Sequence, residues 1–295
     1  AAIAAQTTRI QVGVACSIVP WYHPLRLAQD LATLDVISEG RLLIGVGRGY
    51  QKQEFDAYGQ DMAESRERSV EGMDIALKAW SQERVSYQGK FYTIPEVMVV
   101  PRPLQQPHPP IWMAVTHSPA SAELAVQQRW GIFTVGSTFF PAAPEADANL
   151  ITLYRSQMLA SGVASEAIPI VAVRNMYVSD RAEDALAVMQ PRLQWAGDLA
   201  VYLRSPASRL ARAGGLRGYE HYARDPFIDP ELVQTRGIEA GGAIGTPEQV
   251  RATLHDLQSR HISHFLGSMD TGGLAYEQIA PSLRLFAEQV MPHFK

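Results

Sequence analysis

The sequence predicts an α/β fold organised as a (β/α) barrel. Six segments with the pattern of strands alternate with segments that have the period of helices, at even spacing along 295 residues. No shift in composition separates two domains, so we expect a single domain over residues 1–295, in preference to a two-domain fold. Barrels of this kind have eight strands in about 250 residues. The strands recognised here are therefore two short of the full number.

The first complete helix that we expect lies between two strands. Residues 1–8 read as the end of a helix, and Arg9–Ile18 has the pattern of a strand. The next helix begins at Pro24 and ends at Gly40, which supplies the usual left-handed cap. Its apolar side chains fall on one stripe, formed by Leu27, Leu31, Leu34 and Ile37. This stripe predicts an amphipathic helix with one face on a core.

A glycine-rich turn with one arginine follows the next strand. Leu42–Val46 is a continuous apolar run, typical of a parallel strand buried on both faces, and Gly47-Arg48-Gly49-Tyr50 stands at its carboxyl end. Ligands of α/β folds bind at such strand ends, where glycines let the backbone approach a phosphate and an arginine meets its charge. The turn therefore indicates a phosphorylated cofactor. The alternative is a tight turn in which Arg48 pairs with a carboxylate such as Glu54.

The other regular elements follow from the same periodicities. We expect helices over residues 65–80, 145–161, 181–202, 247–260 and 275–290, and strands over 111–115, 132–135, 168–178 and 264–269. Ser65 and Ser179 are the expected N-caps of two of these helices. Thr246-Pro247-Glu248-Gln249 has the pattern of a capping box.

Three segments interrupt this alternation. Residues 85–92 alternate around Gln88-Gly89, which predicts a small hairpin. The proline-rich run 101–110 must be extended. Residues 203–242 lose periodicity and contain three prolines and six glycines. Long segments of this kind are usually lids or binding elements, so we expect an irregular insertion there.

A second phosphate-binding feature is predicted after the strand at 111–115. Ser118 followed by Pro119 is a strong helix start, with Ser118 at the N-cap and Ser121 at the third helical position. The unpaired amides and partial positive charge of a helix N-terminus suit a phosphate. Plain capping, which needs no ligand, is the alternative. The presence of Arg48 at a neighbouring strand end favours the phosphate.

Composition argues against several other classes of protein. A net charge of −4 gives no reason to expect nucleic acid. The single cysteine, Cys16, excludes an internal disulfide framework, and no apolar run approaches the roughly 20 residues that span a bilayer. No signal peptide is visible, so we expect a cytoplasmic protein. Gly45–Gly49 does not match the dinucleotide fingerprint. No metal site is expected, because His255, His261 and His264 straddle a helix end and a strand start.

Several segments recur in the order and spacing of a known family. They are His23–Gly59, the hairpin at 85–92, Pro101–Val115, Gly245–Val250 and Ser282–Lys295. Over nearly the whole chain they resemble the bacterial luciferase-like, flavin-dependent monooxygenases. The resemblance implies a TIM (β/α)8 barrel that binds reduced FMN, lets it react with O2 to form a flavin peroxide, and oxidises a small organic substrate in an apolar pocket.

The resemblance also implies a cofactor site. Arg48, Ser118 and Ser121 match positions that hold the flavin phosphate, in agreement with the two anion features above. Ala15-Cys16 matches a non-proline cis peptide beside the flavin ring. The remaining residues expected at this cofactor site are Gly47, Tyr50, Val115 and His117.

The chain departs from the family pattern in three places. Gly47 stands where the light-emitting subunit of luciferase has a reactive cysteine, so light emission is not expected, and His117 stands where that subunit has a glutamate. The family's first strand, first helix and second strand, with their active-site histidines, would precede Ala1. We therefore expect a fragment of a longer chain, the alternative being an open barrel. His23 is a weak candidate for a catalytic residue, and packing at the helix entry is its alternative role.

Three functions remain open at this stage. The first is a monooxygenase that acts as a homodimer and takes reduced FMN from a separate flavin reductase. The second is a hydride-transferring oxidoreductase that uses a deazaflavin in the same barrel. The third is a non-catalytic subunit that stabilises a partner, against which stand the preserved residues Arg48, Ser118 and Ser121.

Overall fold

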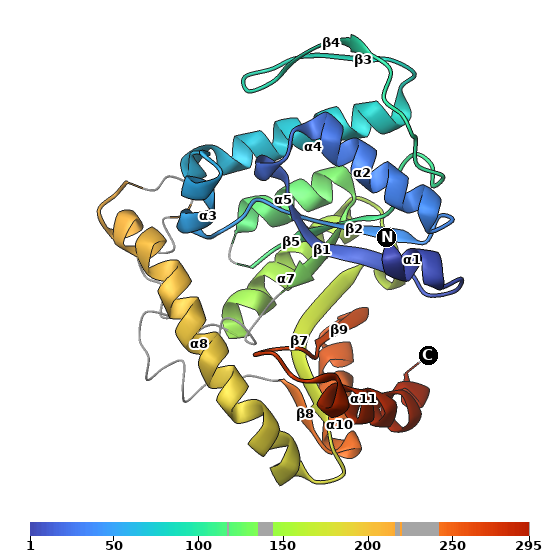
Figure 1. The fold of residues 1–295 in the computed structure, drawn as a ribbon, viewed down its shortest axis with the longest axis vertical. Coiled ribbons are helices and arrows are strands. Elements are labelled where there is room, and N and C mark those ends of the chain that lie inside the picture. Colours follow the sequence, from blue (N-terminus) through green and yellow to red (C-terminus); the bar gives the residue numbers. More distant parts are fainter. Residues whose placement is uncertain (117, 135–143, 216–218, 220–241, 295) are drawn as a thin grey trace. The chain divides into compact units, whose positions relative to one another are not determined.

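The computed structural model describes residues 1–116, 118–134, 144–215, 219 and 242–294, and it divides into two compact units (Figure 1). The first unit contains Ala1–Ala114 and Arg209–Ala223, and the second contains Val115–Ser208 and Arg224–Lys295. Each unit contains parallel strands connected by helices. This arrangement confirms the predicted α/β class.

The first unit is built on three parallel strands. Its helices are α1 (Ala2–Gln6), α2 (Pro24–Ile37), α3 (Lys52–Ala57) and α4 (Ser65–Ser81), with short 3-10 turns at Val19–Trp21 and Met62–Glu64. Its strands are β1 (Val12–Ile18), β2 (Leu42–Gly47), β3 (Val85–Gln88), β4 (Thr93–Val97) and β5 (Ile111–Ala114). The parallel strands lie in the order β1, β2, β5, with Val12 opposite Leu42 and Ile44 opposite Ile111. Their carboxyl ends therefore meet at one edge.

The core of the first unit lies around β2. Ile44 and Val46 are buried, as the continuous apolar run predicts. The predicted stripe of α2 is confirmed at Leu27 and Leu31, which are buried, whereas Ile37 at the helix end is exposed. Helices α2 and α4 lie side by side (Figure 1), and the indole nitrogen of Trp80 on α4 donates a hydrogen bond of 2.9 Å to the carbonyl oxygen of Ala28 on α2. These contacts fix the helical layer beside the strands.

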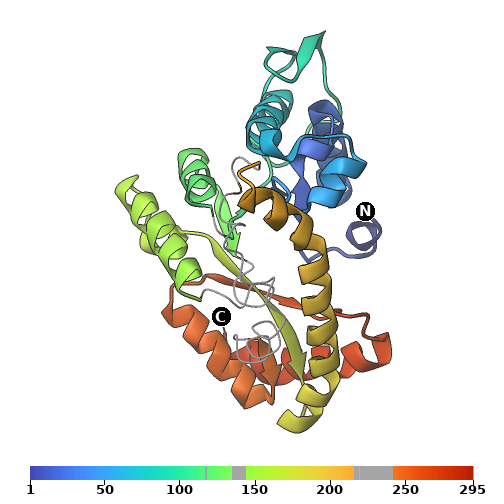
Figure 2. The same cartoon turned by 90° about the vertical axis from the view of Figure 1, so that its left-hand side faces the viewer.

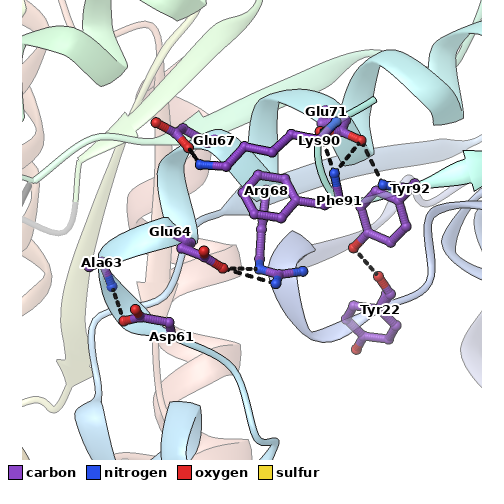
Figure 3. A network of polar contacts seen from close by, with 10 residues as sticks. All are labelled: Tyr22, Asp61, Ala63, Glu64, Glu67, Arg68, Glu71, Lys90, Phe91 and Tyr92. Atoms are coloured by element: carbon purple, nitrogen blue, oxygen red, sulfur yellow. Dashed lines mark hydrogen bonds and ion pairs between the residues drawn. The ribbon is translucent and has the colours of Figure 1, made fainter. Parts of the chain in front are cut away.

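The predicted hairpin is confirmed, since β3 and β4 pair in antiparallel fashion. Its turn is fastened to α4 by Glu71, which is only 8% exposed. The Glu71 carboxylate accepts hydrogen bonds of 2.9–3.2 Å from the backbone amides of Lys90, Phe91 and Tyr92 (Figure 3). A buried charge is tolerated where several donors surround it, as they do here.

A second buried carboxylate fastens the proline-rich run 101–110, which contains no helix, as predicted. Asp35 is fully buried on α2. Its Oδ2 accepts a hydrogen bond of 3.0 Å from the backbone amide of Gln105, and its Oδ1 accepts one of 2.7 Å from the side-chain amide of the same residue. The peptide bonds before Pro101 and Pro107 are cis. The Asp35 hydrogen bonds therefore hold this run against α2.

The second unit is centred on a single long strand. Its helices are α5 (Pro119–Gln128), α7 (Pro144–Ala160), α8 (Ala182–Arg212, whose last four residues are grouped with the first unit), α10 (Pro247–Ser259) and α11 (Tyr276–Leu285), with short turns at Ser165–Ala167, Phe286–Val290 and Met291–His293. Its strands are β6 (Gly131–Thr134), β7 (Ile170–Val178), β8 (Ala243–Gly245) and β9 (His264–Ser268). Strand β7 is almost wholly buried and pairs in parallel with the other three. Helices α5 and α7 lie side by side (Figure 2).

Several boundaries differ from the sequence prediction. Helix α8 continues to Arg212 instead of ending near residue 202, because burial of Ala207 and Ala211 outweighs the unfavourable Pro206. The prediction of Ser65 as an N-cap is wrong, since Ser65 is the first residue of α4 and Glu64 precedes it as the cap.

Two short elements were not predicted. Helix α3 lies in the segment expected to be a loop, and β8 has only three residues. The expected insertion at 203–242 is described only at residues 203–215, 219 and 242, and its other residues lie outside the described part.

Candidate functional site

The carboxyl ends of β1 and β2 approach each other closely at Gly47. Gly47 lies opposite Ile18 in the parallel ladder, and a Cβ atom built on it would lie 2.9 Å from the sulfur of Cys16. A larger residue at this position would require the thiol to shift from its present place. The Ala15–Cys16 peptide bond is cis, as the resemblance implied. Burial raises the pKa of the Cys16 thiol to about 11, so this thiol is neutral at physiological pH.

Arg48 follows directly, and its guanidinium lies over an aromatic ring. The Cζ atom of Arg48 is 3.9 Å from the centroid of the Tyr219 ring, a cation–π contact within the first unit. The alternative prediction, an ion pair between Arg48 and Glu54, is not found among the described residues. Burial raises the pKa of the Glu54 carboxyl, in keeping with the lack of a cationic partner for it there.

Tyr219 is itself held by two hydrogen bonds. Its hydroxyl donates to the carbonyl oxygen of Gly49 at 2.7 Å and lies 2.9 Å from the hydroxyl of Ser65. Because the single phenolic hydrogen is used on Gly49, the Ser65 hydroxyl is the donor in the second bond. Tyr219 and Ser65 are each only 1% exposed. Gly49 has a φ of +81°, so this turn needs a glycine here.

Sequence reasoning missed Tyr219. The residue lies in the segment predicted as an irregular insertion, 170 positions from Gly49, and no local pattern distinguishes it from its neighbours. Ser65 was considered only as a helix cap, although its hydroxyl bonds to Tyr219. Tyr50, which was expected to line the pocket, is 40% exposed at the end of the same turn.

The other predicted residues lie in the second unit. Val115 is fully buried, and its backbone amide donates to the carbonyl oxygen of Phe133 at 3.0 Å. Ser118 is the N-cap residue of α5, as predicted, but its side chain makes no capping hydrogen bond. Ser121 at the third helical position is buried, with 7% of its surface exposed. His117 lies outside the described residues.

The structure places His23 at the entry to α2, beside the hairpin residue Tyr92. His23 is an exposed residue directly before α2, and its ring makes a T-shaped contact with the Tyr92 ring, with 5.8 Å between the centroids. This contact supports the packing role. No three His, Cys, Asp or Glu side chains come together as a metal site among the described residues. None of the described helices is long and apolar enough to cross a membrane.

A hollow of about 510 Å³ lies in the second unit between α7, β7 and α10. It contains three arginines, and protein groups bind each of them: Arg155 donates to Ser165, Arg174 donates to the carbonyl oxygen of Val173, and Arg260 pairs with Asp256. None of the predicted cofactor residues lines this hollow. We therefore keep the strand ends as the candidate site.

Comparison with known proteins identifies relatives over the whole chain. The profile of the family described as luciferase-like monooxygenase matches residues 1–264. The oxygenase component of the flavin-dependent trigonelline monooxygenase of Acinetobacter baylyi is 27% identical, with 99% of this chain and 78% of that protein covered. The FMNH2-dependent dimethylsulfone monooxygenase of Pseudomonas putida is 28% identical, with 99% of this chain and 76% of that protein covered.

Structural and cofactor comparisons add two further findings. The crystal structure of the monooxygenase RslO1 from Streptomyces bottropensis superposes with a TM-score of 0.77 at 30% identity and covers 100% of this chain and 81% of its own. An F420-dependent glucose-6-phosphate dehydrogenase of Kineococcus radiotolerans is 36% identical over 112 residues, which are 36% of this chain and 32% of that protein. The structural comparison confirms the predicted barrel type. The relatives depend on two kinds of cofactor, FMNH2 in the dimethylsulfone enzyme and F420 in the dehydrogenase.

Proposed function

Because this chain belongs to the luciferase-like monooxygenase family, we propose that it is a flavin-dependent monooxygenase that uses reduced FMN and O2 to oxidise a small apolar organic substrate. The similarity to the flavin-dependent trigonelline monooxygenase and the FMNH2-dependent dimethylsulfone monooxygenase supports this choice. The term oxygenase component in the first name supports the further proposal that a separate reductase supplies the reduced flavin. We propose that the working form is a homodimer.

The observation that carries the proposal is the turn after β2. Arg48 presents a fixed positive charge at the carboxyl end of a buried parallel strand, where α/β proteins bind ligands. We propose that this guanidinium binds the FMN phosphate. Ser118 and Ser121, with the amides at the start of the ten-residue helix α5, are the proposed additional donors.

The residues at the ends of β1 and β2 fit a flavin. Gly47 and Gly49 present backbone without side chains, and the Cys16 thiol beside them is neutral. A neutral sulfur is a suitable neighbour for an aromatic ring and a poor nucleophile. When bound, the reduced flavin supplies the electrons that activate O2. The residues of this chain orient the cofactor, and we propose Tyr50, Val115 and His117 as further cofactor-binding residues.

The direct test is an anaerobic titration with reduced FMN, followed by a pulse of O2 while the flavin absorbance is recorded. We expect tight binding of reduced FMN and oxidation of the bound flavin by O2. In the presence of a substrate, this oxidation should be accompanied by formation of the oxidised product. Arg48→Ala should weaken FMN binding by about 1.5–3 kcal/mol, the value of a charge-assisted hydrogen bond. Arg84→Ala is the matched control, because Arg84 forms an exposed ion pair with Glu96 on the hairpin. Equal affinities for all three proteins would exclude the phosphate role of Arg48.

The second candidate is hydride transfer with a deazaflavin. The F420-dependent relative, 36% identical over 112 residues, favours keeping it. The same titration with coenzyme F420 distinguishes the two: tight binding of F420 without O2 consumption would replace the monooxygenase proposal. Failure to bind either cofactor would favour the non-catalytic subunit.

A further inference from the structure

We infer that Tyr219 is a positioning residue that holds the Arg48 guanidinium in place for the phosphate of the flavin. The inference rests on the proposed function, because it takes Arg48 to be a phosphate ligand. It adds a residue that lies 171 positions further along the chain than Arg48 and that belongs to the same compact unit.

The position of the Tyr219 ring is fixed from both sides. Its hydroxyl donates to Gly49, the neighbour of Arg48, and accepts from Ser65 at the start of α4. Gly49 is itself closely packed: it has a φ of +81°, and a Cβ atom on it would lie 2.9 Å from Phe55, which is fully buried. The ring is thus part of the same packed structure as the turn it supports.

The chemistry of the contact suits a phosphate ligand. In general, a carboxylate beside an arginine offsets its charge and competes with a phosphate for its N–H donors. An aromatic ring binds the cation over its face and takes no hydrogen bond from it. Burial raises the pKa of the Tyr219 phenol above its ordinary value, so the ring stays neutral at physiological pH although Arg48 and Ser65 lower the pKa.

Holding the side chain in place also reduces the cost of binding. A long arginine side chain loses rotamer freedom when it binds a ligand, and part of that loss is removed if the chain is ordered beforehand. The 3.9 Å contact between the Arg48 Cζ atom and the ring centroid orders it in the absence of ligand. Tyr219 therefore acts on the phosphate through Arg48.

The test compares reduced FMN with reduced riboflavin, which has the same ring system and no phosphate. Dissociation constants are measured anaerobically for the wild type, Arg48→Ala, Tyr219→Met and the double variant. Methionine fills the space without an aromatic face. We expect Tyr219→Met to weaken FMN binding about tenfold, within the range of a partly buried cation–π contact, and to leave riboflavin binding unchanged. The double variant should bind FMN no more weakly than Arg48→Ala.

Two further variants separate positioning from folding. Tyr219→Phe keeps the ring and should keep the preference for FMN within about twofold of the wild type. Tyr87→Met is the matched control, because the Nζ atom of Lys78 on α4 lies 4.7 Å from the centroid of the Tyr87 ring on the hairpin, which is a second cation–π contact. It should leave both dissociation constants unchanged. Circular dichroism verifies that each variant is folded.

Each outcome has a distinct meaning. If the wild type binds FMN no more tightly than riboflavin, or Arg48→Ala leaves the preference intact, the phosphate role of Arg48 fails and the inference is overturned with it. If Arg48→Ala loses the preference while Tyr219→Met keeps it, only the inference is overturned. Should Tyr219→Met not fold, loss of the preference in folded Tyr219→Phe would equally overturn the role of the ring.

Discussion

Replacing Glu71 by glutamine tests how the hairpin is attached. The carboxylate is buried and accepts four hydrogen bonds, from the amides of Lys90, Phe91 (to both oxygens) and Tyr92. Glutamine has nearly the same size, but its NH2 group would face amide N–H donors and its charge is lost. Hydrogen bonds to a charged group contribute about 1.5–3 kcal/mol each, and an unsatisfied buried donor costs about 1–3 kcal/mol. Because glutamine retains one acceptor oxygen, we expect Glu71→Gln to lower the free energy of unfolding by about 2–3 kcal/mol.

The assay is urea denaturation followed by tryptophan fluorescence, together with hydrogen exchange of the turn amides. The midpoint should fall, and exchange should accelerate at Lys90, Phe91 and Tyr92 before the rest of the unit. Glu67→Gln is the matched control: Glu67 lies one turn earlier on α4 and pairs with the exposed Lys90 ammonium, so its loss should cost less than about 1 kcal/mol. A Glu71→Gln midpoint equal to that of the control would refute the reasoning.

Two further predictions concern the ends of β1 and β2. Since burial raises the pKa of the Cys16 thiol from 9.0 to about 11, alkylation of the native protein by iodoacetamide at pH 8 should be much slower than that of a free thiol and should accelerate up to pH 11. Alkylation at the rate of free cysteine, measured by mass spectrometry, would contradict the raised pKa. The same pKa shift also means that the protonated thiol contributes its full share to the free energy of unfolding below pH 9, and that this contribution is lost as the pH rises to 11. Gly49→Ala should destabilise the protein by about 2–3 kcal/mol, because alanine there is strained at positive φ and meets Ile18 and Phe55. An unchanged thermal midpoint would show that the turn can relax.

Much of the fold is predictable from local chemistry. The strand at 42–47 and the helix before it follow from hydrophobic periods, and the capping box at Thr246 is confirmed with both of its hydrogen bonds. The end of α8 is not predictable in this way, because Pro206 signals a stop and only burial of that turn in the folded chain overrides it. Local sequence signals such as a capping box therefore predict the start of a helix better than its end, because the end also depends on packing in the folded chain.

The candidate site shows the same division. The Gly47-Arg48-Gly49 turn could be recognised because strand, glycines and charge are adjacent in sequence. Tyr219 could not, since its significance comes from three contacts with residues more than 150 positions away. The Ala15–Cys16 cis bond was anticipated only through resemblance, because no composition rule marks a cis bond without proline.

The close approach of Gly47 and Cys16 makes the two positions share one volume. A Cβ atom at residue 47 would lie 2.9 Å from the sulfur at residue 16, so the Cys16 side chain would have to move to make room for it. A side chain at position 47 therefore requires a different Cys16 rotamer or a smaller residue at position 16. A redesign that introduces a thiol at position 47 is therefore best combined with a smaller residue at position 16, because the two side chains would occupy neighbouring space.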